Sequence, residues 1–186
     1  MFWVVAALGA AAALVLSLTV DLSGRSVPNG PRETTVVAGR SPLVVGRSPL
    51  VDQPAPPIDL RDLEGRRVRL ADFDGRPVIV NFWASWCIPC REEFQLFREA
   101  RAAHAEEGLE ILGIVHDDSA ANAAEFVAQE AAEWPALMDP DDVAWAAYLN
   151  PALPTTFFID REGIVRAVSY GPPPADVLED HLARIF

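Results

Sequence analysis

The chain has 186 residues and a net charge of −12, from 27 acidic residues and 15 basic residues that are all arginine. This length allows one domain with a core of its own plus accessory segments. The acidic charge argues against a nucleic-acid partner, whose phosphates demand the opposite sign, and two cysteines, Cys87 and Cys90, are too few for a small fold held together by disulfides.

Residues 1–20 carry no charged side chain and predict a transmembrane anchor. As a helix, the residues after Met1 would span roughly 29 Å, about the thickness of a hydrocarbon core. A cleaved signal peptide is the alternative, but its usual positive start and small-residue cleavage site are missing. The arginines at 25, 32, 40 and 47 follow this segment and would favour the cytoplasmic side. We nevertheless expect the folded domain outside the cytoplasm, because long domains translocate regardless of charge.

Residues 21–52 are expected to form a flexible linker, since they are rich in Pro, Gly, Ser and Arg and lack sustained periodicity. A near-exact repeat lies inside it, at 39–45 and 46–52, and two copies are too few for a solenoid. A coil of this length would reach about 30 Å root-mean-square. The linker would therefore let a tethered domain meet partners near a membrane.

Residues 53–186 alternate strand-like and helix-like patterns, which predicts one α/β domain. The strand patterns cover residues 67–70, 78–82, 109–115, 155–159 and 164–170. The helix patterns cover residues 89–107, 120–132, 143–149 and 175–185. Gly108 is the expected end of the first helix and Ser119 the expected cap of the second.

The cysteine pair lies between an apolar strand pattern and a helix pattern. A cysteine at a helix start faces free backbone N–H groups and the positive end of the helix dipole, and both stabilise the reactive thiolate. Cys90 lies one turn further on, close enough to attack a mixed disulfide formed at Cys87. Because so short a ring hardly stabilises a fold through loop entropy, the spacing predicts a redox-active disulfide.

Metal binding is the main alternative for a lone Cys-x-x-Cys, which can be half of a zinc site. The histidines His104, His116 and His181 are scattered and show no ligand spacing. A soft-metal chaperone would need exposed sulfurs on a mobile loop, whereas an aromatic-rich strand leads directly into this pair. We therefore expect neither a metal nor a cofactor.

Seven segments together carry a resemblance to a known family, at residues 48–50, 54–56, 75–87, 90–93, 139–141, 154–160 and 163–165. They resemble the thioredoxin superfamily, and within it the membrane-anchored TlpA/ResA/DsbE-type thiol–disulfide oxidoreductases. The resemblance implies a thioredoxin-like α/β fold, with a central mixed sheet flanked by helices. It covers most of residues 48–186 and is more specific for fold and chemistry than for biological role.

The resemblance also implies roles for single residues. Cys87 would be the exposed nucleophile and Cys90 the partly buried resolving thiol. Pro154 would be a cis-proline that faces the pair and turns the backbone of Leu153 toward the sulfurs, ready to pair with an extended substrate. Without the resemblance, Pro154 would be interpreted as an ordinary trans turn proline.

Glu93 lies one helical turn after Cys90 and matches a glutamate that these relatives carry near the site. A carboxylate there would disfavour a nearby thiolate and relay protons. The alternative is that Glu92 and Glu93 simply solvate the first helical turns. Asn81 stands where cytoplasmic thioredoxins have a buried aspartate, which strengthens the case for Glu93 as the proton acceptor.

The other residues near the pair are expected to shape the site. Trp86 would shield the disulfide, while Ile88 and Pro89 bring no charge or hydrogen-bonding side chain to hold a thiolate. Arg91 either aids the thiolate or, as we prefer, solvates the helix. Trp83 is interpreted as a core residue, and His116, Asp117 and Asp118 as loop and cap residues.

Two positions depart from the family pattern. Gln95 replaces a helix-kinking proline of many relatives, and Thr155 stands where several cytochrome-maturation members have glutamate. The second departure weakens assignment to that narrow branch and leaves the redox chemistry untouched.

The expected function is a membrane-anchored, extracytoplasmic thiol–disulfide oxidoreductase of the bacterial cell envelope, with a reducing potential. The resemblance suggests apocytochrome c as a protein substrate and a membrane electron donor that re-reduces the pair. Two alternatives stay open: a general envelope disulfide reductase or repair factor, and a non-catalytic thioredoxin-like binding module.

Overall fold

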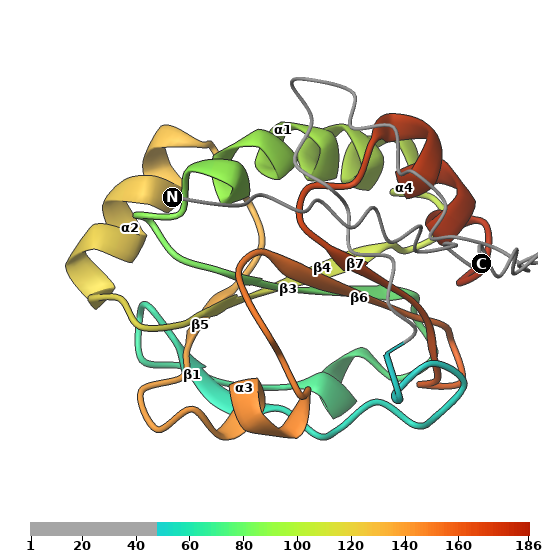
Figure 1. The fold of residues 1–186 in the computed structure, drawn as a ribbon, viewed down its shortest axis with the longest axis horizontal. Coiled ribbons are helices and arrows are strands. Elements are labelled where there is room, and N and C mark those ends of the chain that lie inside the picture. The colour runs from blue at the N-terminus through green and yellow to red at the C-terminus, as the bar shows by residue number, and fades with distance from the viewer. Residues whose placement is uncertain (1–47) are drawn as a thin grey trace, which may run out of the picture. The chain divides into compact units, whose positions relative to one another are not determined.

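Seven strands form one mixed sheet in the computed structural model, which describes residues 48–186 (Figure 1). The strands are β1 (Asp59–Asp62), β2 (Arg67–Arg69), β3 (Val78–Trp83), β4 (Glu110–Val115), β5 (Ala136–Met138), β6 (Thr155–Ile159) and β7 (Val165–Tyr170). Their order in the sheet is β2-β1-β5-β4-β3-β6-β7. The central strand β3 pairs in parallel with β4 and antiparallel with β6.

Helices cover both faces of this sheet (Figure 1). One face carries α1 (Ile88–Ala103), α2 (Ala120–Gln129) and α4 (Ala175–Leu182), and the other carries α3 (Val143–Ala147) and a 3₁₀ helix, η1 (Leu70–Phe73). Because successive strand residues point to opposite faces, β3 supplies Ile79 and Trp83 to the α1 side and Val80 and Phe82 to the α3 side. Burial on both faces explains why β3 reads as a nearly continuous apolar run.

All predicted strands and helices are present, with differences at their ends. The first helix was expected to reach residue 107, but α1 ends at Ala103. The chain turns there through Gly108, whose φ of +80° suits glycine, and the N–H of Leu109 donates to the carbonyl of His104. Ser119 caps α2 as expected, since its side chain accepts the N–H of Asn122 at 3.1 Å.

Two strands were missed in the sequence. β1 reads Asp-Leu-Arg-Asp, and β5 has only three residues. Their pairing with each other, Arg61 with Met138 and Asp62 with Leu137, joins segments far apart in the chain, so neither has a strong local pattern.

The last residues of the predicted linker contact the domain. The N–H of Asp52 donates to the carbonyl of Val165 at 2.7 Å, and Arg166 lies 3.2 Å from the Asp52 carboxylate. The predicted anchor at 1–20 and the linker up to residue 47 lie outside the described residues. Within residues 48–186, no helix has the length and apolar character needed to cross a membrane.

Candidate active site

The two cysteines lie where β3 gives way to α1, and they form a disulfide with Cα atoms 5.3 Å apart. Cys87 is the N-cap residue of α1, and its Sγ accepts the backbone N–H of Cys90 at 3.2 Å. Pro89 fits the first turn because the N–H that it lacks has no partner inside the helix. The backbone N–H that meets the sulfur here would also stabilise a Cys87 thiolate after reduction.

The expectation of an exposed Cys87 is wrong for this oxidised form. Cys87 keeps 5% of its surface exposed and Cys90 none. Both pack in the apolar cluster between α1 and the sheet, with Leu153 against it. The disulfide holds Cys87 close to the buried Cys90, which leaves only a narrow part of Cys87 open. Cys87 is still the more accessible cysteine, beside Ile88, which is 79% exposed.

The loop before β6 has the backbone form that the resemblance implies. The peptide bond between Leu153 and Pro154 is cis. Pro154 is buried and Leu153 half-buried. The carbonyl of Pro154 accepts the N–H of Gly171 at 2.9 Å, and the Thr155 hydroxyl donates to the carbonyl of Ala152 at 2.7 Å. The first bond fixes the loop against the end of β7, and the second closes the loop on itself.

Glu93 is fully buried, so the interpretation that it merely solvates α1 is wrong. Its carboxylate accepts the amide N–H of Asn81 at 2.7 Å and faces the hydroxyl of Thr156 at 3.5 Å. Burial raises the pKa of Glu93 from 4.5 to about 8, and the two hydrogen bonds offset only part of that effect. Glu93 is therefore mainly a neutral carboxylic acid at pH 7.

Thr156 completes this buried polar group and had no expected role in the sequence. It accepts a second N–H of Asn81 at 3.0 Å, because Asn81 on β3 and Thr156 on β6 are register partners. The sequence signal for this group is that Asn81 and Thr156 are polar residues inside otherwise apolar strand patterns, and both lie on the face of the sheet that α1 covers. Since Cys90 and Glu93 lie one turn apart on the buried side of α1, the polar group lies next to the resolving cysteine.

The loop between β4 and α2 supports the segment before Cys87. The carboxylate of Asp118 accepts the N–H of Ser85 at 2.6 Å, and the carbonyl of Asp117 accepts the indole N–H of Trp86 at 2.9 Å. Burial alone raises the pKa of Asp118, but hydrogen bonds from Ser85 and Ser119 outweigh burial and hold this pKa below its usual value. Asp117 and Asp118 thus do more than the loop and cap roles expected of them.

Trp86 is 58% exposed, and its bond to Asp117 holds the ring toward that loop. Its predicted shielding of the disulfide stays a prediction. Trp83, by contrast, is fully buried, as expected for a core residue.

An acidic groove of about 460 Å³ lies beyond the Asp117 loop, and its lining includes His116, Asp117, Asp118, Asp139 and Asp142.

Arg91, directly after Cys90, was expected to solvate the helix but makes specific contacts with α2. Its guanidinium donates to the carboxylate of Glu130 and to the side-chain oxygen of Gln129, and it lies 4.6 Å from the ring centroid of Phe126. No local pattern predicts this pairing, because it joins positions 39 apart in the chain.

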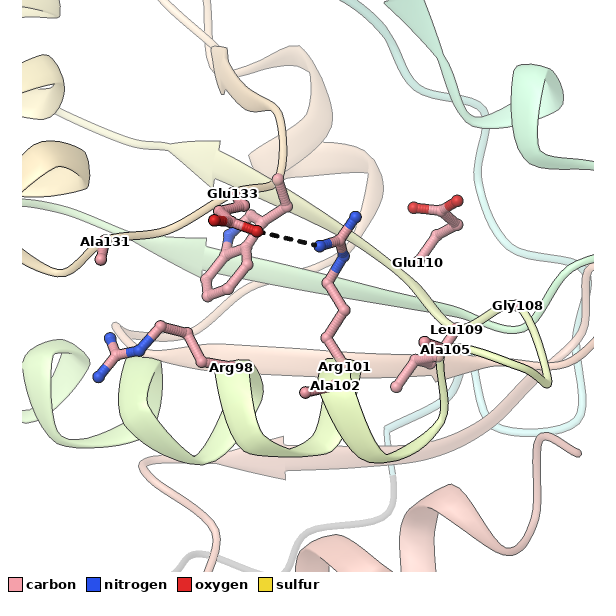
Figure 2. A pocket seen from close by; sticks show the side chains of 10 residues that line it. Arg98, Arg101, Ala102, Ala105, Gly108, Leu109, Glu110, Ala131 and Glu133 are labelled. Carbon is pink, nitrogen blue, oxygen red and sulfur yellow. Dashed lines mark ion pairs between the residues drawn. The ribbon is translucent and has the colours of Figure 1, made fainter.

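A second cavity, of about 490 Å³, lies at the opposite end of α1 (Figure 2). Arg98 and Arg101 extend from α1 beside it, and an ion pair of 3.9 Å joins Arg101 to Glu133. None of the expected site residues lines this cavity. This cavity is therefore separate from the cysteine pair, which lies at the N-terminus of α1.

Comparisons with known proteins agree with this geometry. A family model described as the AhpC/TSA family matches residues 51–168. The thiol-disulfide oxidoreductase ResA of Geobacillus thermodenitrificans is 35% identical over 131 residues, which cover 70% of this chain and 75% of that protein. ResA of Bacillus subtilis is 32% identical over 131 residues, with 70% and 73% covered.

A solved structure shows the same fold. The Chlorobium tepidum protein assigned as thiol:disulfide interchange protein DsbE superposes with a TM-score of 0.66 at 34% identity, covering 72% of this chain and 96% of that one. Family, fold and cysteine geometry agree, and the chain belongs to the AhpC/TSA family of thioredoxin-like proteins as a thiol–disulfide oxidoreductase.

Proposed function

We propose that the reduced protein reduces disulfides of other proteins outside the cytoplasm, with Cys87 as the attacking thiol and Cys90 as the resolving thiol. The observation that carries this proposal is the asymmetry of the pair. Cys87 caps α1 and keeps some exposure, whereas Cys90 is completely buried. A substrate sulfur can therefore reach Cys87 first.

The reaction moves two electrons from the cysteine pair to the substrate. The Cys87 thiolate attacks one sulfur of the substrate disulfide, which forms a mixed disulfide and releases the other substrate sulfur as a thiolate. The Cys90 thiolate then attacks the Cys87 sulfur, which restores the Cys87–Cys90 disulfide and releases the second substrate sulfur. Protons taken up by the substrate thiolates balance those lost from the two cysteines.

Glu93 is proposed to exchange the proton of Cys90, and Leu153 to position the substrate. The pKa of Glu93, about 8, lies close to neutral pH, and Glu93 lies one turn from Cys90 inside the same buried region. Its ionised form can therefore accept the Cys90 proton, and its neutral form can return that proton when the pair is re-reduced. The backbone of Leu153, next to the cis bond, would pair with an extended substrate segment, while Trp86, Ile88 and Pro89 would frame the opening.

The protein is proposed to be anchored in the bacterial cell envelope by residues 1–20, with the domain on the extracytoplasmic side. The uncharged apolar segment and the linker support this arrangement. A membrane electron donor would re-reduce the pair after each turnover, because the oxidised disulfide is the end product of the reaction.

Apocytochrome c is the proposed substrate class, supported by the family resemblance of the active-site segments. A general envelope reductase is the second candidate, and one observation favours it. Thr155, where several cytochrome-maturation relatives have glutamate, is buried and turned into its own loop toward the carbonyl of Ala152. It therefore offers a substrate no charged contact.

The Cys90→Ser variant separates these candidates, because the mixed disulfide at Cys87 can no longer be resolved. We expect it to accumulate covalent adducts in cells, and mass spectrometry of the adducts identifies the partners. A single cytochrome partner supports the narrow role, and many partners support the broad one.

The matched control is Cys87→Ala with Cys90 retained, which should trap nothing. If this variant sustains the same cellular function as the unchanged protein, the chain is a binding module instead. Redox titration of the protein against glutathione tests the direction: a potential above about −150 mV, toward the oxidant end of the range, would reject the reductase role.

A further inference from the structure

The positive charge nearest to the disulfide along α1 belongs to Arg91, and it is paired by a residue of α2. Arg91 directly follows Cys90, and its guanidinium meets the carboxylate of Glu130, the C-cap residue of α2. A further bond of 3.3 Å reaches the side-chain oxygen of Gln129. The Glu130 side chain is only 14% exposed, and that of Arg91 is 46% exposed.

Aromatic packing fixes the guanidinium in this place. It lies over the ring of Phe126, 4.6 Å from the centroid. Phe126 stacks on Trp83 with centroids 4.9 Å apart and meets Phe94 edge-on at 5.0 Å. Trp83 is the last residue of β3 and Phe94 lies on α1, and these two elements flank the cysteines. The ion pair therefore packs against the elements that form the active site.

An unpaired guanidinium in this position would stabilise a thiolate at the cysteine pair. In a partly buried site the effective dielectric constant is well below that of water, so a unit charge acts on a thiolate that it does not touch. Stabilising the thiolate favours the reduced dithiol, and a disulfide whose reduced form is stabilised is a stronger oxidant. A carboxylate against the guanidinium cancels most of that effect.

We propose that the Arg91–Glu130 pair sets the reduction potential of the Cys87–Cys90 disulfide, with Glu130 as a positioning residue that keeps it reducing. Glu130 holds the Arg91 guanidinium over Phe126 and neutralises its charge one residue from Cys90. This inference rests on the proposed redox function of the cysteine pair and adds a residue of α2 that adjusts it.

The test is the equilibrium of the protein with reduced and oxidised glutathione at low salt, measured for Glu130→Gln. We expect the equilibrium constant to shift at least twofold toward the dithiol, which is about 9 mV at 29.6 mV per tenfold change. In an Arg91→Gln background, the same Glu130→Gln change should shift the constant by less than twofold, because the guanidinium no longer holds the carboxylate beside the cysteine pair and water then screens its charge from the sulfurs.

Arg98→Gln is the matched control background. The Arg98 guanidinium donates to the backbone carbonyl of Glu130 and lies 3.8 Å from the Glu130 carboxylate. Arg98 lies seven residues after Arg91 on α1, about two helical turns further from the cysteines. Glu130→Gln should keep its full effect there. Thermal unfolding of each variant measures any purely structural loss, which would not follow this pattern.

Two results would overturn the inference: a shift below twofold for Glu130→Gln alone, or an equal shift in the Arg91→Gln and Arg98→Gln backgrounds. Failure of the proposed function looks different, because the unchanged protein itself would then either not exchange its disulfide with glutathione or show an oxidising potential.

Discussion

Single side chains at this site owe their chemistry to burial more than to charge. Cys90 and Glu93 are both completely buried on one side of α1, and the nearest partners of Glu93 are the neutral groups of Asn81 and Thr156. Neutral partners cannot replace the hydration that a carboxylate loses on burial. Glu93 therefore holds a proton at a pH where an exposed glutamate would not.

Glu93 should make the oxidised protein less stable as the pH rises. Its pKa is about 8 when folded and near 4.5 when unfolded, so the folded state binds the extra proton. The associated stability is complete below pH 4.5 and is lost as the pH rises to 8. Between pH 5 and pH 8 the loss is on the order of 3 kcal/mol.

Urea unfolding of the oxidised protein and of Glu93→Gln at both pH values measures this loss. The difference between the two stability curves isolates Glu93, because every other titrating group is shared. Parallel curves would show that Glu93 is ionised in the folded protein at pH 5 as well.

Helix α2 is the element that links the surroundings of the disulfide. Directly before its start, the Asp118 carboxylate accepts the N–H of Ser85, which precedes the cysteines in the chain. At its end, the Glu130 carboxylate pairs with Arg91, which follows them. Between these contacts, Phe126 stacks on Trp83. The cysteine segment is thus supported at both ends by one helix, and this support comes from contacts across the fold.

Gly113 of β4 permits the close packing of β3 on its neighbour. A Cβ atom there would lie 2.7 Å from Nε1 of Trp83 and 3.4 Å from Nε1 of Trp134. We expect Gly113→Ala to lower the free energy of unfolding by about 1–3 kcal/mol, the usual cost of overpacking a core. Urea unfolding measures it.

A double-mutant cycle with Trp83→Phe identifies the cause, because the smaller ring withdraws the atom that the new methyl group meets. The Gly113→Ala change should cost clearly less in that background. An equal cost in both backgrounds would assign the effect to the backbone of β4 and not to Trp83.

The charge of the whole molecule is −12, and the groove beside the active-site loop has the same sign. Asp117, Asp118 and Asp142 line this groove, and Asp118 is held in its charged form. Long-range fields of this kind change encounter rates with charged reactants and are screened by salt. Cationic disulfides should therefore approach Cys87 faster than anionic ones.

The measurement compares reduction of cystamine, a dication, with that of 3,3′-dithiodipropionate, a dianion. We expect the ratio of their rate constants to fall about fivefold or more between 10 mM and 500 mM salt, within the range known for electrostatic steering. The change of this ratio with salt isolates the electrostatic contribution, because the intrinsic reactivities of the two disulfides enter the ratio equally at both salt concentrations. A ratio that does not change would show that the acidic surface has no effect at the sulfurs.

The prediction of the fold succeeded where local pattern and tertiary environment agree. The strand before Cys87 and the helix after it were predicted because β3 is buried on both faces and α1 on one. β1 and β5 were missed because they are short and pair with each other across the chain. The ends of α1 and α2 were placed too late, since their last turns open into loops that the helical pattern does not mark.

The residue pattern was enough to predict the chemistry: two cysteines at a helix start, a strand that leads into them, and a carboxylate one turn on. Folding was needed to show how deeply Cys87 is buried, that Glu93 contacts Asn81 and Thr156, and that Arg91 pairs with Glu130. The difference lies in the range of the interactions. Helix capping and periodicity act between near neighbours in the chain, whereas desolvation and charge pairing depend on residues that only folding brings together.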